Sequence, residues 1–176
     1  MGFDAAHAIS ALSKLALRAY RKKEDIQKRT DAQEAIESVL RKYEDRVGFL
    51  ALLESRGRDI FMHMIVSEDE GTTLKALYLA EDVNKEDKDG NTYLTFACLY
   101  HKPKVIEKLL DMGADPNHYS CPLLKALGRK NEANPAILAL FLRHGVDLKT
   151  DVHGRTLEET IRSFGDAALD ELLDRR

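Results

Sequence analysis

Four residues in the middle of the chain have the types and spacing of metal ligands. Cys98-Leu-Tyr-His101 is a Cys-x-x-His pair, and His118-Tyr-Ser-Cys121 is a His-x-x-Cys pair. Four nitrogen and sulfur ligands are what a structural zinc site uses. Zinc binding is therefore one chemistry open to this chain, and reduced core thiols beside surface histidines are the alternative interpretation.

A cysteine and a histidine can also form a catalytic pair, but such a pair needs a third, orienting group and a pocket, to which no motif points. The acidic runs at 67–70 and 86–89 lack the glycine and the spacing of a calcium loop, which favours solvated turns. The sequence has no Gly-rich phosphate loop, metalloprotease motif or nucleophile elbow. We predict a protein that is not an enzyme and uses no cofactor or metal.

A basic cluster with an aromatic neighbour lies near the N-terminus. It runs Arg18-Ala-Tyr-Arg21-Lys22-Lys23, and Lys28 and Arg29 follow it. Such a cluster can touch phosphates or an anionic membrane, or it can be the charged end of a solvated helix. Because the net charge of the chain is −3, we expect no nucleic-acid partner. A membrane-peripheral protein that uses a basic amphipathic N-terminal helix is the alternative function.

Composition bounds the class of protein. The chain has 176 residues, 44% apolar and 32% charged, which is typical of a soluble globular protein with one domain, or with a short solenoid and an extension. Asp4 and His7 interrupt the first residues, so no secretory signal is expected, and the two cysteines are expected to be reduced. We expect a cytoplasmic location. An effector that is translocated into another cell would also be found in a cytoplasm.

Charge is unevenly distributed. Residues 1–30 hold seven Lys or Arg against three acids, and residues 66–90 hold eight acids against three Lys. These segments attract each other, meet separate partners, or are simply two solvated faces.

A helical pattern must position all of these residues. The turn Asp89-Gly90-Asn91 precedes Thr92, which suits the N-cap of a short helix that faces Leu94 and Ala97 inward. A second helix follows and ends at Gly113, a residue that tolerates a left-handed backbone. Its apolar residues have helical spacing: Val105, Ile106, Leu109 and Leu110. One such unit cannot bury its own apolar face, so the pattern predicts neighbours.

The pattern recurs on both sides. Downstream, Cys121-Pro-Leu-Leu-Lys-Ala126 begins a second copy, whose second helix is expected at 135–144 with Asn134 as its N-cap. A third copy starts at Asp151-Val-His-Gly-Arg-Thr156. Upstream, residues 59–84 form a weaker copy with helices at 60–66 and 72–79, and Asn84 stands 33 residues before Asn117.

Residues 89–117 resemble one whole ankyrin repeat, and the resemblance extends over about 57–176. It implies an all-α ankyrin-repeat solenoid of helix-turn-helix units with short hairpins: 57–86 degenerate, 87–117 clear, 118–149 fair, and 150–176 a C-terminal cap. The chain departs from the family pattern in three ways. Thr95 and Leu124 stand where the motif Thr-Pro-Leu-His has its histidine, so the usual hydrogen bonds of that histidine are replaced or lost. Tyr119 replaces the turn glycine, which predicts a distorted hairpin. The connection 128–134 is lengthened.

Residues 1–56 do not repeat and are expected to form an N-terminal helical extension or cap. The spacing predicts one amphipathic helix over 3–23 and a second helix that is capped by Thr30, with Gln33 completing a capping box, and runs toward Leu53. Gly48 is expected to bend or break it. We expect both helices to pack on the open end of the stack, a hypothesis that deletion of residues 1–56 tests.

The ankyrin resemblance implies a protein-binding module, such as an inhibitor, an adaptor or scaffold, an immunity protein or an effector, that acts as a monomer on another protein. In this family the partner lies against the hairpin tips and the inner face of the first helices. Those positions are here Lys88, Asp89, Asn91, Leu99, Tyr100, His118, Ser120, Arg129, His153, Arg155 and Phe164. An exposed aromatic residue on a rigid surface often anchors an interface, although Tyr100 can equally pack on a neighbouring repeat.

Overall fold

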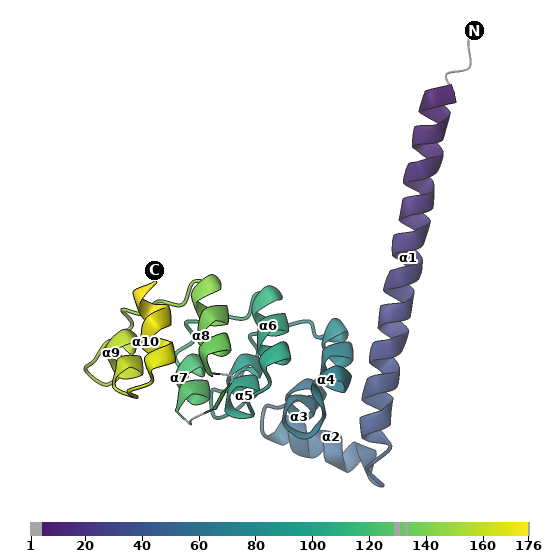
Figure 1. Cartoon of the computed structure of the whole chain (residues 1–176). Coiled ribbons are helices and arrows are strands. Elements are labelled where there is room, and N and C mark those ends of the chain that lie inside the picture. The colour runs from purple at the N-terminus through teal and green to yellow at the C-terminus, as the bar shows by residue number, and fades with distance from the viewer. Residues whose placement is uncertain (1–4, 129–130, 133, 176) are drawn as a thin grey trace.

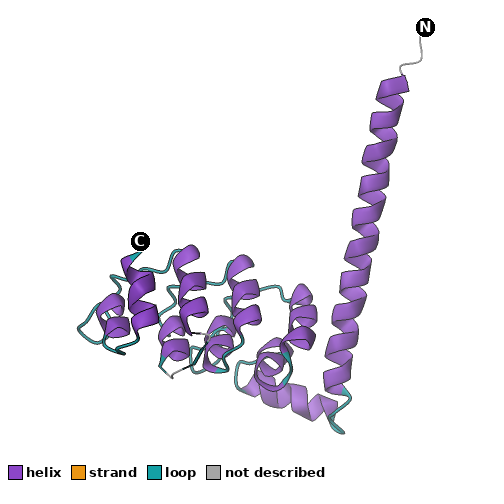
Figure 2. Cartoon of the chain, in the orientation of Figure 1, coloured by secondary structure: helices purple, strands orange, loops and turns teal. Residues whose placement is uncertain are grey.

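The computed structural model of the protein describes residues 5–128, 131–132 and 134–175, with side chains from residue 20 onward. Within these residues the regular elements are helices, joined by loops and one isolated bridge between Asp151 and Thr156 (Figure 2). The expected all-α ankyrin-repeat solenoid is therefore confirmed. The helices are α1 (Ala5–Leu40), α2 (Arg46–Ser55), α3 (Ile60–Ser67), α4 (Glu70–Ala76) with the 3₁₀ turn η1 (Leu77–Leu79), α5 (Tyr93–Leu99), α6 (Pro103–Asp111), α7 (Pro122–Leu127), α8 (Asn134–Arg143), α9 (Leu157–Arg162) and α10 (Ala167–Asp174).

Helices α3 to α10 form four successive pairs that stack side by side in a row, and α1 stands at one end (Figure 1). The first three pairs contact one another through both layers, α3 to α5 to α7 in one and α4 to α6 to α8 in the other. The last pair contacts its neighbour through α10 and α8. One apolar core runs along the row from Met62 to Leu173. The four apolar residues predicted for the second helix of the clear repeat are all buried there: Val105, Ile106, Leu109 and Leu110. Neighbouring pairs thus cover the apolar face that a single unit would leave exposed.

The predicted start and stop signals of the clear repeat are in place. Thr92 caps α5 and forms a capping box with Thr95. Gly113 follows α6 with a φ of +91°, and the next amide, of Ala114, donates to the carbonyl of Leu109 at 2.9 Å. A left-handed glycine that closes such a bond is the common end of a helix.

Asparagines form a ladder between successive repeats. Asn84 donates through Nδ2 to the Gly113 carbonyl at 3.1 Å and accepts at Oδ1 from the amide of Asp115 at 2.8 Å. Asn117 makes the same two contacts one repeat later, to the carbonyl of Gly145 and the amide of Asp147. The 33-residue spacing in the sequence is thus the spacing of a structural contact. Lys149 occupies the next equivalent position, so the ladder ends before the last pair.

The predicted division of the N-terminal region into helices at 3–23 and from Thr30 is wrong. Residues 5–40 form one helix, and Thr30 lies inside it with its hydroxyl donating to the carbonyl of Ile26 at 3.0 Å. A threonine hydroxyl can bond back within a continuous helix, and no Gly or Pro interrupts residues 24–40, so the capping-box pattern has no helix start to cap. Gln33 accordingly lies within the same helix.

The chain turns instead at 41–45. Asp45 caps α2 by accepting the amide hydrogen of Gly48 at 2.9 Å. Gly48 therefore neither bends nor breaks a helix, since it lies in the first turn of α2. A Cβ at Gly48 would lie 2.2 Å from an oxygen of Asp45, so a larger residue here would have to displace the capping side chain.

Among the residues of α1 with described side chains, those of the C-terminal part pack on the stack. Ala35 and Val39 are buried against Met64 and Ala76 of the first helix pair, and Ala32 on the same face is buried too. Residues 20–30 are exposed, and the helix extends past the row of repeats (Figure 1). The expected docking of the N-terminal region thus holds for the end of α1 that adjoins α4.

Candidate partner-binding surface

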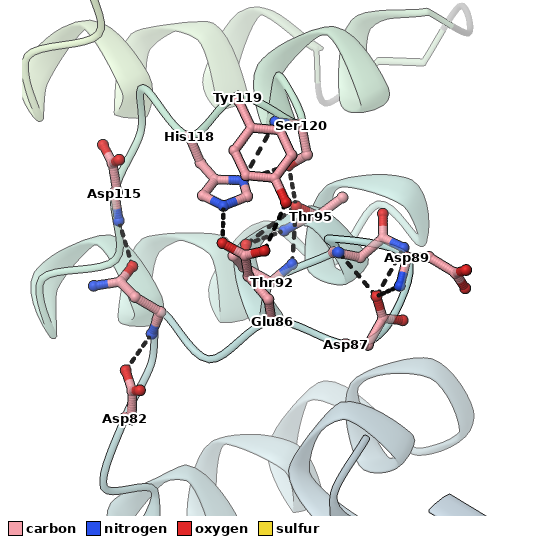
Figure 3. A network of polar contacts seen from close by, with 12 residues as sticks. Asp82, Glu86, Asp87, Asp89, Thr92, Thr95, Asp115, His118, Tyr119 and Ser120 are labelled. Atoms are coloured by element: carbon pink, nitrogen blue, oxygen red, sulfur yellow. Dashed lines mark hydrogen bonds and ion pairs between the residues drawn. The ribbon is translucent and has the colours of Figure 1, made fainter. Parts of the chain in front are cut away.

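A chain of hydrogen bonds links the hairpins of two neighbouring repeats (Figure 3). Glu86, in the loop before α5, contacts Nε2 of His118 at 3.0 Å, and Nδ1 of His118 lies 2.8 Å from Oγ of Ser120. Ser120 Oγ is in turn 2.7 Å from Oγ1 of Thr95, which belongs to the capping box of α5. The hairpin at 118–120 is therefore attached to the preceding repeat at both the loop and the start of the helix.

Thr95 replaces the hydrogen bonds of the family histidine at this position. Its hydroxyl accepts from the amide of Thr92 at 3.3 Å and reaches Ser120 in the next repeat. The sequence left open whether these bonds are replaced or lost, and at Thr95 they are replaced.

Tyr119 changes the hairpin, although not by adopting the backbone of the glycine it replaces. The left-handed residue of this hairpin is Cys121, with a φ of +50°, two positions later. The tyrosine side chain lies over Gly90, because its hydroxyl is 2.3 Å from where a Cβ at Gly90 would be. That hydroxyl donates to Oε2 of Glu86 at 2.6 Å, while 70% of the residue remains exposed. The predicted distortion is thus a shift of the left-handed position.

The charge of Glu86 is stabilised by these contacts. Hydrogen bonds from Tyr119 and His118 lower the pKa of the Glu86 carboxyl below its ordinary value. The same carboxylate raises the pKa of the Tyr119 hydroxyl, since it accepts the phenolic hydrogen. Glu86 is therefore an ionised acceptor that holds two side chains of the next repeat.

Asp87 makes the preceding hairpin rigid. Its Oδ1 accepts from the amides of Asp89 and Asn91 at 3.0 and 2.9 Å, and its Oδ2 accepts from Nε of Arg58 at 2.9 Å. Burial acts to raise the pKa of Asp87, but the hydrogen bonds from Asn91, Arg58 and Asp89 outweigh it and the pKa lies below its ordinary value. A carboxylate with several amide donors fixes the turn that carries Asp89 and Asn91.

The structure divides the predicted partner-binding residues into groups. One group lies on the two linked hairpins: Lys88, Asp89, Asn91, His118 and Ser120. At the end of α5, Leu99 is half-buried and Tyr100 is 49% exposed. His153 and Arg155 in the last hairpin and Phe164 after α9 are exposed. Arg129 lies outside the described residues.

Tyr100 makes no recorded hydrogen bond or ring contact through its side chain in the described part of the chain. Two residues of the linked hairpins were missed as candidates, Tyr119 and Glu86. Tyr119 was detectable as a departure from the repeat pattern, whereas Glu86 had no signal because its partners lie 32 and 33 residues away.

The four potential zinc ligands do not form a site. Cys98 is fully buried in α5, where burial raises the pKa of its thiol, and Nε2 of His101 donates to the carbonyl of Ala126 at 2.9 Å. His118 is held by Glu86, and Sγ of Cys121 lies 3.6 Å from the carbonyl of Tyr119. Among the described residues, no three His, Cys, Asp or Glu side chains are grouped as a metal site requires. In the same residues, no helix is long and apolar enough to cross a membrane.

Comparisons with known proteins place the repeat pattern in a family. A family model described as ankyrin repeat matches residues 89–118. The ankyrin repeat domain-containing protein SAT10 of Stachybotrys chartarum (strain CBS 109288 / IBT 7711) is 37% identical over 78 residues. That match covers 43% of this chain and 4% of the relative's length, so the chain corresponds to a small part of that protein.

Proposed function

Since the chain belongs to the ankyrin-repeat family, whose repeats bind other proteins, we propose that it is a non-enzymatic module that binds one partner protein through its linked hairpins. The linked hairpins are residues 86–91 and 118–120. Tyr119 is the central contact in this proposal, and Tyr100 at the end of α5 is a second one.

The observation that carries the proposal is the state of Tyr119. The residue is 70% exposed, yet its hydroxyl is bonded to Glu86 and lies against Gly90. Tyrosine is enriched among the residues that dominate binding energy, and an aromatic side chain that is already ordered loses little conformational entropy when it binds. Monomeric proteins usually bury an aromatic ring, and no contact among the described residues of this protein requires the Tyr119 ring to be exposed.

The mechanism would be steric. A rigid surface would occupy or position the partner without chemical change, in a cytoplasmic monomer that serves as an inhibitor, an adaptor or scaffold, an immunity protein or an effector. Three of the predicted residues on these hairpins, Lys88, Asp89 and Asn91, would form the polar rim around Tyr119.

Affinity capture with single-residue variants tests this function. We would immobilise the full chain and the variants Tyr119→Ser, Tyr100→Ser and Tyr20→Ser, and identify bound proteins from an extract of the source organism by mass spectrometry. Tyr20 is an equally exposed tyrosine on α1, which makes it a matched control. We expect a protein that binds the wild-type chain and Tyr20→Ser, and whose recovery falls about tenfold or more with Tyr119→Ser. Equal recovery by all four proteins, at equal melting temperature, would contradict the proposal.

The membrane-peripheral alternative stays a prediction of the basic cluster. It requires salt-sensitive binding to anionic vesicles that disappears when residues 1–30 are removed. In the same vesicle assay, the function proposed here predicts that wild-type and truncated chains behave alike.

A further inference from the structure

One face of α1 changes character along its length. Val39, Ala35 and Ala32 succeed one another at helical spacing and are buried on the first repeat. The same face continues with Lys28 one turn before Ala32, Asp25 two turns before it and Arg21 three turns before it, and all three are exposed. The helix is thus apolar on this face where it docks and charged where it extends past the stack.

A groove opens where the docked part gives way to the charged part. It has a volume of about 330 Å³ and is lined by Lys28 and Asp31 of α1, Leu74, Lys75 and Tyr78 of the α4–η1 segment, and Lys108 of α6. Tyr78 is 36% exposed and bonds through its hydroxyl to the carboxylate of Asp25, which fixes the ring beside α1. The groove therefore has a mixed lining, apolar at Leu74 and the Tyr78 ring and basic around them.

Two of the three lysines that line this groove lack a partner carboxylate in the described residues. In the part of the chain that the structure describes, no ion pair is recorded for Lys75 or Lys108. Lys28 pairs with Glu24 at 2.7 Å, and Asp31 already accepts a hydrogen bond from Gln27 at 2.7 Å. The ammonium groups of Lys75 on α4 and Lys108 on the neighbouring helix α6 thus line the groove without a partner carboxylate among the described residues.

We propose that this groove binds an acidic segment of a partner protein, which places carboxylates against Lys75, Lys108 and Lys28 and an apolar side chain against Leu74 and Tyr78. Arg21, two turns before Lys28 on α1, would extend the contact. Charge complementarity to the lysines favours an acidic partner. The apolar lining of Leu74 and Tyr78 favours a partner with an apolar side chain, which a surface of phosphate groups lacks. Asp31 in the wall also disfavours a uniformly anionic surface such as a membrane or a nucleic acid. This surface is separate from the linked hairpins, so it stands whether or not they bind a partner.

Peptide binding to the full chain tests the inference. The probe is a fluorescein-labelled amphipathic peptide with Glu on one face and Leu and Phe on the other, and its binding is followed by fluorescence anisotropy. A second peptide replaces Leu and Phe with Ser. The charge-reversal pair is Lys75→Glu with Lys108→Glu. The matched control is Lys125→Glu with Lys149→Glu, two exposed lysines elsewhere on the stack that change the net charge equally.

We expect the groove pair to weaken binding of the amphipathic peptide by about tenfold or more, and the control pair by less than about twofold. Binding should also weaken as salt rises, and the Ser peptide should bind more weakly to the wild-type chain. If the variant with Lys75→Glu and Lys108→Glu melts at a lower temperature than the wild-type chain, the variant with Lys75→Gln and Lys108→Gln replaces it. That variant should still bind the peptide more weakly than the wild-type chain does.

Three results would overturn the inference. The peptide does not bind at millimolar concentration, the control pair lowers its affinity as much as the groove pair does, or anionic vesicles bind through Lys75 and Lys108 while the peptide does not compete.

Discussion

At the scale of single residues, hydroxyl groups perform the role that the family motif gives to an imidazole. Thr95 bonds within its own capping box and to Ser120 of the next repeat, so one threonine both starts a helix and joins two repeats. Tyr119 and Glu86 add a second bond between the same repeats. Because both bonds cross from one repeat to the next, substitutions here should act on the stacking of repeats as well as on each hairpin.

Gly90 gives the sharpest prediction at this scale. Its φ is +74°, and the hydroxyl of Tyr119 lies where its Cβ would be, whereas Gly154 has a similar φ of +84° with nothing near its Cβ position. Gly154→Ala should destabilise by about 1 kcal/mol through backbone strain alone, and Gly90→Ala by about 2 kcal/mol or more. Chemical denaturation measures both values. Adding Tyr119→Ser to Gly90→Ala should remove the difference, and a difference that persists would contradict the proposed packing of Tyr119 on Gly90.

At the scale of elements, an aromatic cluster joins the turn after α1 to α2 and α3. The ring of Tyr43 stacks on Phe49 with centroids 3.7 Å apart, and its hydroxyl lies 2.8 Å from Nε2 of His63. Because Tyr43 lies within the turn at 41–45, these contacts fix the direction in which the chain enters the stack. The histidine of this cluster makes the junction sensitive to pH.

Burial lowers the pKa of His63 below its ordinary value of 6.5, with Glu68 opposing and Lys42 adding to the shift. A lowered pKa in the folded state means that the unfolded chain takes up the proton first as pH falls below 6.5. The contribution of neutral His63 to stability is therefore complete above that pH and is lost below it. We expect the wild-type chain to melt at a lower temperature at about pH 5 than at about pH 7.5. His63→Phe should show a smaller difference between the two conditions, and an unchanged difference would exclude His63 as the cause.

At the scale of the whole molecule, the repeats form a linear stack in which each pair meets only its neighbours, and α1 is attached at one end. Tyr78, in the acidic segment 66–90, bonds to Asp25 in the basic segment 1–30. Arg21, Lys22 and Lys23 of α1 are exposed, whereas Lys28 and Arg29 pair with Glu24 and Asp25 of the same helix.

Truncation separates the two parts of α1. Residues 20–30 are exposed, so removing residues 1–30 should leave the melting temperature nearly unchanged. Removing residues 1–56 uncovers Met64 and Ala76 and takes away Val39, so it should lower the melting temperature by about 5 °C or more and reduce solubility. An equally stable and soluble chain without residues 1–56 would contradict a capping role for this region.

Much of the fold was predictable because its signals are local or strictly periodic. The Thr92 cap, the left-handed Gly113 and the apolar spacing from Val105 to Leu110 each depend on a few consecutive residues. Thr30 shows the limit of local reasoning, since a helix start and a hydroxyl bonded inside a helix leave the same short pattern. The candidate site was predictable as a set of hairpin positions, but the exposed fraction of Tyr100 was not.

The sequence by itself determined the repeat, its period and the residues that face the core, because hydrophobic spacing and capping act within one unit. Only the tertiary structure decided that Glu86 holds Tyr119 and His118, that Ser120 meets Thr95, and that α1 leaves a basic groove beside α4. These contacts join residues 25 or more positions apart, or helices that approach only when the stack forms. Their geometry is set by the packing of repeats against one another, which no local pattern encodes.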